Sequence, residues 1–142
     1  MAVPFIQIGQ CGNQVGQSFY SMMHEEGGKA SPGHQALLEQ FFTKDKAKAL
    51  LVDMEPKVVG KCLSRSSSWK YDPALSLVRA EGSGNNWAYG CYTHGPNVKE
   101  DLENVIKRLV EPEDYISTFV QLQSMAGGTG SGLGTYILHL ID

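Results

Sequence analysis

Four glycines lie within six residues near the end of the sequence, in the segment Ala126-Gly127-Gly128-Thr129-Gly130-Ser131-Gly132. Such a segment allows close approach of the backbone and positive φ angles, so that successive N–H groups turn inward and bind an anion. A helix that starts there adds its positive end, and Thr129 and Ser131 add hydroxyl groups. A flexible linker has a similar composition, but linkers do not usually separate an apolar strand from an apolar helix. The segment predicts a phosphate-binding loop.

This loop differs from the two most familiar nucleotide motifs. Neither GxxxxGK[ST] nor GxGxxG occurs in the sequence, which disfavours an ordinary P-loop NTPase and a dinucleotide-binding oxidoreductase. Ser124 precedes the loop without the GxSxG context of a hydrolase nucleophile.

A second candidate loop is Gly9-Gln10-Cys11-Gly12-Asn13-Gln14, which follows the first apolar stretch. Gln10 can donate to a phosphate, and Cys11 can line a base or a sugar. A tight turn with an amide cap would have the same sequence, and a lone cysteine at a helix start is commonly a small core residue. Both interpretations stay open from the residues alone.

Two further polar loops follow candidate strands. Asp53 and Glu55 lie two residues apart after an apolar run, so both carboxylates can face one Mg²⁺ beside a phosphate. Alternatively, Asp53 caps a helix that begins at Pro56, which leaves Glu55 without a role. The segment 82–87 is a third glycine- and asparagine-rich loop, or only a turn.

The apolar pattern predicts the elements that carry these loops. Continuous apolar runs predict strands at 3–8, 49–52, 75–79 and 116–122, and helical spacing predicts helices at 35–42, 57–65, 98–109 and 133–141. An additional helix from about residue 10 is expected to bury the face formed by Cys11, Val15, Phe19 and Met22. Glycines and Ser31-Pro32-Gly33 end that helix in a loop. The alternation predicts an α/β fold with a doubly wound, mostly parallel sheet and ligands at the carboxyl ends of its strands.

Composition sets outer limits on the function. The chain has 142 residues, 15 acidic and 12 basic side chains, and 42% hydrophobic residues, which suits one domain or part of one. No apolar run is long enough to cross a membrane, no secretory signal is recognisable, and no Lys/Arg cluster suggests a nucleic-acid partner. Three cysteines without CxxC spacing and four histidines without shared spacing favour a reducing compartment and no zinc site.

The four loops, taken in order, resemble those of the tubulin superfamily over essentially the whole sequence. Gly127 to Gly132 resembles the signature phosphate loop of that family, and the other three resemble its first three nucleotide loops. Within the family the sequence looks most like the δ class, with the ε and γ classes as alternatives. The segments that carry the δ resemblance are 69–71, 82–90, 94–96 and 124–128.

The resemblance implies a guanine-nucleotide site (GTP/GDP) with Mg²⁺ and no catalytic residue of its own. Glu55 would hold or approach the Mg²⁺, Asp53 would act through water, and Gly84 would border the terminal phosphate with Asn85. The expected nucleotide-binding residues are Gln10, Cys11, Asn85, Ser124, Gly127, Gly128, Thr129, Gly130 and Ser131.

The resemblance also implies a role and a setting. The expected protein is a GTP-binding structural component of the microtubule cytoskeleton, located in the cytoplasm at centrioles, basal bodies or cilia. Its expected partners are other tubulin subunits or microtubule-organising structures. Residues 1–142 would then be the N-terminal part of a nucleotide-binding domain, without the acidic loop that a neighbouring subunit supplies for hydrolysis. An autonomous hydrolase with Glu55 as base, and a binding module that retains the loops but no nucleotide, remain alternatives.

Overall fold

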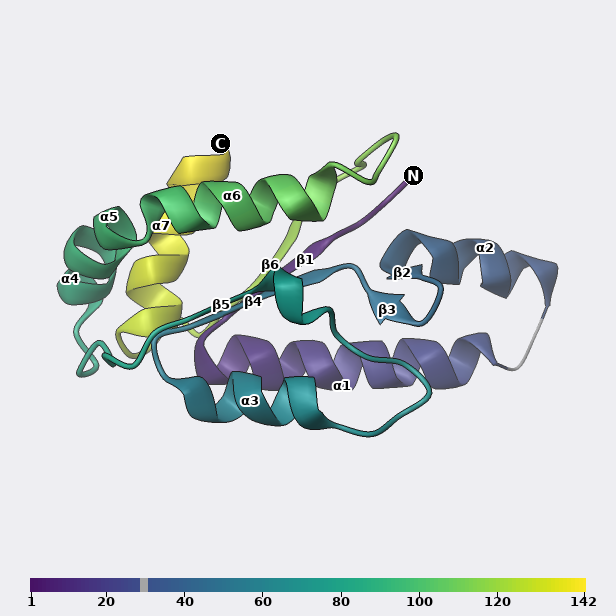
Figure 1. Ribbon diagram of the computed structural model, residues 1–142, viewed down its shortest axis with the longest axis horizontal. Helices are drawn as coiled ribbons and strands as arrows, with labels where there is room; N and C mark the ends of the chain where they lie inside the picture. The colour runs from purple at the N-terminus through teal and green to yellow at the C-terminus, as the bar shows by residue number, and fades with distance from the viewer. Residues whose placement is uncertain (29–30) are drawn as a thin grey trace.

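A four-stranded parallel sheet forms the centre of the computed structural model, which describes residues 1–28 and 31–142 (Figure 1). Its strands, in spatial order, are β5 (Ser76–Val78), β4 (Ala49–Asp53), β1 (Phe5–Ile8) and β6 (Val120–Leu122). Phe5 is in register with Ala49 on one side and with Val120 on the other. All four expected strands are confirmed, although β6 is shorter than predicted because Ile116 forms only an isolated bridge with Ala2.

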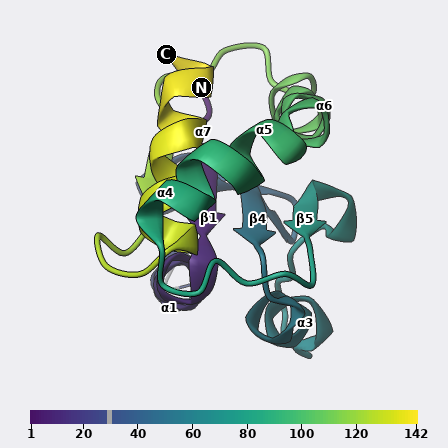
Figure 2. The same cartoon turned by 90° about the vertical axis from the view of Figure 1, so that its left-hand side faces the viewer.

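Helices cover both faces of this sheet (Figures 1 and 2). On one face lie α1 (Gly9–Gly27) and α3 (Pro56–Ser64), with α2 (Pro32–Phe41) beside α1. On the other face lie α6 (Lys99–Val110) and α7 (Gly134–Ile141). The loop expected between α1 and α2 includes residues 29–30, which lie outside the described residues. The prediction of a doubly wound α/β fold is confirmed.

Alternation along the strands divides the core in two. Ile6 and Ile8 point into a cluster with Leu102 of α6 and Ile137 of α7. Phe5 points the other way, into a second cluster, here called the aromatic cluster because half of its buried residues are aromatic. That cluster includes Tyr20, Phe42, Trp69 and Tyr71, and burial raises the pKa of both tyrosine hydroxyls. Trp69 is 2% exposed, its ring centre is 5.1 Å from that of Tyr71, and the Arg65 guanidinium lies 4.4 Å from its centre.

The buried face of α1 differs from the predicted one. Val15 and Met22 are 50% and 66% exposed, and Cys11 is also exposed, whereas Phe19 packs against Phe5 in the core. The prediction from the apolar spacing is therefore confirmed for Phe19 and wrong for the other three residues. The residues that α1 buries are Gly9, Gly12, Asn13, Gly16 and Tyr20. Because most of these residues are small, the helix backbone can lie close to the sheet. A search for spaced apolar side chains does not detect such residues.

Several short elements were not predicted. A hairpin joins β2 (Phe42–Thr43) to β3 (Lys46–Ala47), and a helical segment runs through α4 (Trp87–Tyr89), the π-helix η2 (Gly90–His94) and α5 (Gly95–Asn97). The short helix η1 (Pro73–Leu75) precedes β5. A π-helical turn, η3 (Thr129–Leu133), leads into α7, so the last helical segment begins inside the glycine loop, four residues earlier than expected. On α6 the residues Leu102, Val105 and Leu109 are buried, and on its exposed side Glu103 pairs with Lys99.

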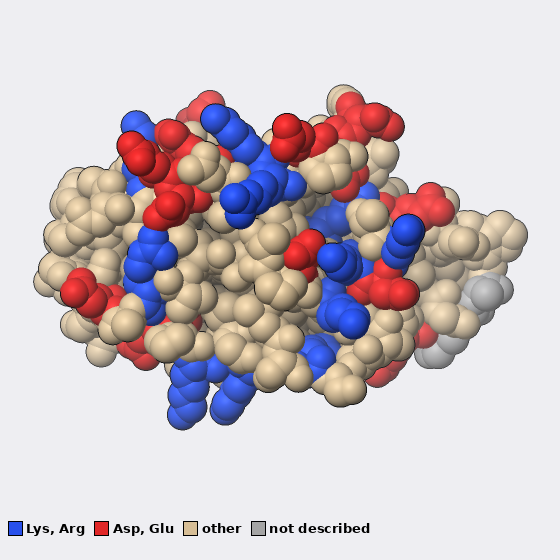
Figure 3. Space-filling view, viewed as in Figure 1, with Lys and Arg blue, Asp and Glu red and all other residues tan. Residues whose placement is uncertain are grey.

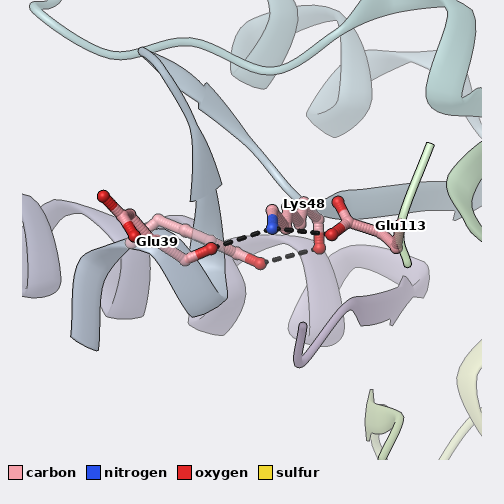
Figure 4. Close-up of polar contacts among 4 residues, drawn as sticks. Glu39, Lys48 and Glu113 are labelled. Atoms are coloured by element: carbon pink, nitrogen blue, oxygen red, sulfur yellow. Dashed lines mark hydrogen bonds and ion pairs between the residues drawn. The ribbon is translucent and has the colours of Figure 1, made fainter. Parts of the chain in front are cut away.

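One nearly buried ion pair ties the far end of the sheet together (Figure 4). Lys48 Nζ lies 2.9 Å from Glu113 Oε2 and donates to the Glu39 carbonyl at 2.8 Å, and the two charged side chains are only 12% and 15% exposed. The pair fixes the segment before β6 to α2 and to the start of β4. The ion pair lies at the amino ends of the strands. It is at the opposite end from the loops that follow the carboxyl ends.

Candidate nucleotide-binding site

The strand order reverses between β1 and β6. From β1 the chain moves to β4 and β5 on one side, and then returns to β6 on the other. In open α/β sheets, ligands bind outside the carboxyl ends of the strands at such a reversal. Figure 2 looks onto this end of the sheet.

A cavity of about 760 Å³ lies at that position. Its lining comes from four stretches, within 8–15, 53–61, 83–85 and 124–130, each of which follows one of the four strands. The volume falls in the range of small-molecule and cofactor sites. The convergence of the four loops, inferred from their order along the sequence, is therefore present in the structure.

Residues with a left-handed backbone conformation are concentrated in the cavity wall. Four of the five residues with positive φ in the described ranges line it. They are Gly9 (φ 73°), Gly84 (56°), Asn85 (56°) and Gly127 (85°). Backbone turned in this way directs N–H groups toward a bound anion.

Two helical segments begin at the cavity. The first turn of α1 contributes Gly9, Gln10 and Cys11 to the lining, and the first turn of η3 contributes Thr129 and Gly130. N–H groups in a first helical turn have no partner within the helix and carry partial positive charge. Both segments therefore offer donors to an anion in the cavity.

Gly128 allows the phosphate loop to pack against the 83–86 loop. A Cβ at Gly128 would lie 2.3 Å from Ser83 Cβ and 2.8 Å from the Asn86 backbone nitrogen. The hydroxyls of Ser83 and Thr129 are 3.0 Å apart, which links the same two loops. The two loops thus form one wall.

Asn13 is buried behind the cavity wall and links two of the strand ends that carry it. Its amide donates to the Gly9 carbonyl at 2.8 Å and to the Val52 carbonyl at 3.1 Å, which joins the start of α1 to the end of β4. Asn13 does not cap α1, because no described side chain accepts a hydrogen bond from the first turn of this helix, so the amide-cap interpretation of the first loop is wrong. Cys11 is exposed and lines the cavity, so its interpretation as a core residue is also wrong.

The two carboxylates of the second loop have different environments. Asp53 is 4% exposed and its Oδ1 accepts a hydrogen bond from the Glu55 backbone N–H at 3.2 Å. Desolvation raises the pKa of Asp53, and hydrogen bonds from the backbone of Glu55 and Met54 partly oppose this. Glu55 is exposed and lies over Gly82, with Oε1 2.7 Å from where a Cβ would be. Glu55 is also the residue before α3, so the proposed helix cap by Asp53 is wrong.

We expect Asp53→Asn to change how stability depends on pH. Because the folded-state pKa is raised, the native state holds a proton that the unfolded state releases. The contribution of this group to stability therefore declines as pH rises from about 3.8, the ordinary pKa of an aspartate, through the folded-state pKa. Denaturant unfolding from acidic to neutral pH should show wild type losing free energy of unfolding relative to Asp53→Asn. A relative gain for wild type over that interval would contradict the desolvated carboxylate.

Eight of the nine expected nucleotide-binding residues line the cavity, as do Asp53 and Glu55. The exception is Ser131, which is buried outside the lining and donates its hydroxyl to the Gly127 carbonyl. The sequence interpretation missed Lys57, Val58 and Lys61 on α3. The available signal was the i,i+4 spacing of two lysines directly after the acidic loop.

An exposed aromatic residue lies beside the same loops. Trp87 is 41% exposed, and its indole N–H donates to Thr135 Oγ1 at 3.4 Å. Its carbonyl oxygen lies 2.3 Å from where a Cβ at Gly132 would be. Trp87 thus packs on the helical segment that carries the phosphate loop.

Comparison with known proteins gives a family and a set of relatives. The family model "Tubulin/FtsZ family, GTPase domain" matches residues 2–142. The chain is 44% identical to the "Tubulin delta chain" of Canis lupus familiaris over 96% of its length, and 42% identical to that of Homo sapiens over 100%. It is 40% identical to the mouse (Mus musculus) delta chain, also over 100%.

These relatives confirm the resemblance to the δ class. The chain spans about a third of their length, 34% of the dog protein and 35% of the human and mouse proteins. No helix in the described part of the chain combines the length and the apolar character needed to cross a bilayer. With a family match over residues 2–142, a sheet that reverses at the nucleotide loops and a glycine-walled cavity, the chain belongs to the Tubulin/FtsZ family.

Proposed function

We propose that the chain binds a guanine nucleotide as part of the GTPase domain of a δ-tubulin-like protein. The observation that carries this is the cavity at the reversal of strand order, lined by glycines and polar residues from four strand-end loops. Such a wall suits a di- or triphosphate. The choice of guanine follows from family membership.

The residues of the cavity suit distinct parts of the nucleotide. The first turn of α1 and residues 128–130 would offer backbone N–H groups to the phosphates. Gln10 and Ser124 would add side-chain polar groups, Cys11 would add a sulfur at the wall, and Asn85 would border the terminal phosphate; all of them line the cavity. Gly127 provides the turn that precedes this backbone.

The acidic loop fits Mg²⁺ bound together with a phosphate. The described residues contain no group of three side chains that would hold a metal alone. Mg²⁺ is commonly bound by one or two carboxylates with phosphate oxygens and water, which is what Asp53 and Glu55 offer. Glu55, which is exposed and lies over Gly82, would hold the ion. Asp53 would act through water. Bound Mg²⁺ would neutralise phosphate charge.

The cellular role is proposed from the delta-chain relatives. Residues 1–142 would belong to a tubulin-type nucleotide-binding domain, and the partners would be other tubulin subunits or microtubule-organising structures. The location would be the cytoplasm and cytoskeleton, at centrioles, basal bodies or cilia.

Calorimetric titration with GTP, GDP and ATP, with and without Mg²⁺, tests the proposal. We expect guanine nucleotides to bind and GTP affinity to increase with Mg²⁺. Absence of guanine-nucleotide binding would overturn it.

Glu55→Gln is expected to disturb Mg²⁺ more than Asp53→Asn does. Loss of a charged oxygen ligand at Glu55 should raise the Mg²⁺ concentration that half-maximally enhances GTP binding by about tenfold. Loss of the indirect contact at Asp53 should raise it by roughly threefold. Titration of Mg²⁺ at fixed GTP measures both values. An equal or reversed order would make Asp53 the direct ligand.

A further inference from the structure

Two lysines at the rim of the cavity have no partner within the described residues. Lys57 and Lys61 are exposed, and the ammonium group of neither forms an ion pair or a hydrogen bond there. By contrast, Lys46, Lys48 and Lys99 are all paired with carboxylates. Figure 3 shows basic side chains projecting from the edge of the molecule that α3 forms.

The position of the lysines on α3 is fixed by helical spacing. Lys57 and Lys61 lie one turn apart and share a face. Val59 and Cys62 are buried on the opposite side of α3, in the aromatic cluster. Because α3 is anchored there, the lysine face is held toward the cavity, where Val58 also contributes to the lining.

The charges in the lining explain why these lysines matter. Four charged side chains line the cavity: the carboxylates of Asp53 and Glu55, and the ammonium groups of Lys57 and Lys61. A triphosphate brings several further negative charges next to the carboxylates. Mg²⁺ would offset part of that charge. Among the described residues, the two lysines are the only cationic side chains of the lining that could offset the remainder.

We propose that Lys57 and Lys61 form a cationic rim that contacts the outermost phosphate of the bound nucleotide. The rim favours the triphosphate over the diphosphate and makes its binding sensitive to salt. This rests on the proposed nucleotide function and adds residues that neither the phosphate loop nor the acidic loop contains. Long, exposed ammonium groups act through screened Coulomb attraction, so their effect is greatest at low ionic strength.

The test compares Lys57→Gln/Lys61→Gln with wild type in GTP and GDP titrations at fixed Mg²⁺. At low salt we expect GTP affinity to fall about tenfold and GDP affinity by about threefold or less. At about 1 M salt, where the Debye length is about 3 Å, both proteins should bind GTP equally. Lys57→Arg/Lys61→Arg should restore the wild-type GTP/GDP ratio and salt dependence.

The matched control is Lys107→Gln/Arg108→Gln, which removes the same charge from exposed positions on α6, across the sheet. It should leave GTP affinity and the GTP/GDP ratio unchanged. Thermal unfolding checks that every variant is folded. If wild type binds GTP and the glutamine pair keeps its affinity, nucleotide ratio and salt dependence, the rim proposal alone fails and the lysines are a solvated face. If wild type binds no guanine nucleotide, the proposed function fails and the rim proposal fails with it.

Discussion

Gly128→Val is expected to abolish nucleotide binding. Even the Cβ of the new side chain would lie 2.3 Å from Ser83 Cβ and 2.8 Å from the Asn86 backbone nitrogen, so the phosphate loop and the 83–86 loop must separate. Forcing a side chain into such a contact costs about 3 kcal/mol, which corresponds to at least about a hundredfold loss in affinity if the cost falls on the bound state. Calorimetric titration with GTP measures the loss.

The effect of Gly128→Val arises from lack of space. Gly128 has φ −100°, and the positive φ expected within the phosphate loop is found at Gly127. The matched control is Gly60→Ala in α3, where a Cβ meets nothing within 4 Å. That control should bind GTP as wild type does. GTP affinity within about threefold of wild type in folded Gly128→Val would count against the two-loop wall.

The second large effect is expected from Gly12→Ala, in stability. A Cβ at Gly12 would lie 2.2 Å from the Leu122 carbonyl oxygen, a backbone atom in β6 that has no side-chain freedom with which to yield. α1 must then move away from the sheet. We expect the free energy of unfolding to fall by about 3 kcal/mol and the melting temperature by about 10 °C.

Gly60→Ala is again the control for Gly12→Ala. Alanine is the better helix former by about 1 kcal/mol, so Gly60→Ala should be as stable as wild type or more stable. Denaturant unfolding of both variants separates helix propensity from packing. If Gly12→Ala also proves as stable as wild type, α1 does not pack on β6 at the distance described.

The sequence predicted the sheet better than the packing upon it. β4 was recognisable because a strand covered on both faces is apolar throughout. The contacts of α1 with the sheet were not recognisable from the sequence. They depend on Gly12 and Gly16, which allow close packing because they have no side chain. The helical segment from Trp87 was missed because Gly90, Gly95 and Pro96 normally interrupt a helix, whereas here π-helical turns include or adjoin them.

At the candidate site, too, the arrangement of the loops was predictable from the sequence and the direction of individual side chains was not. The order of the loops predicted which strand ends meet, because carboxyl ends of parallel strands share one edge of a sheet. The direction of individual side chains depends on local hydrogen bonds that sequence spacing does not contain. Ser131, which turns back to Gly127, and Lys57, which reaches the rim from α3, are the two clearest cases.

The two tryptophans lie in different environments, so their fluorescence should report on different parts of the protein. Trp69 is sealed in the aromatic cluster under the Arg65 guanidinium, whereas Trp87 is partly open to solvent and bonded to the helix that carries the phosphate loop. Because a buried indole emits at shorter wavelength than an exposed one, the emission of Trp69 should move to longer wavelength when the chain unfolds. The emission of Trp87 should respond to changes in the phosphate loop beside it. One unlabelled sample would then report on unfolding through Trp69 and on the phosphate loop through Trp87.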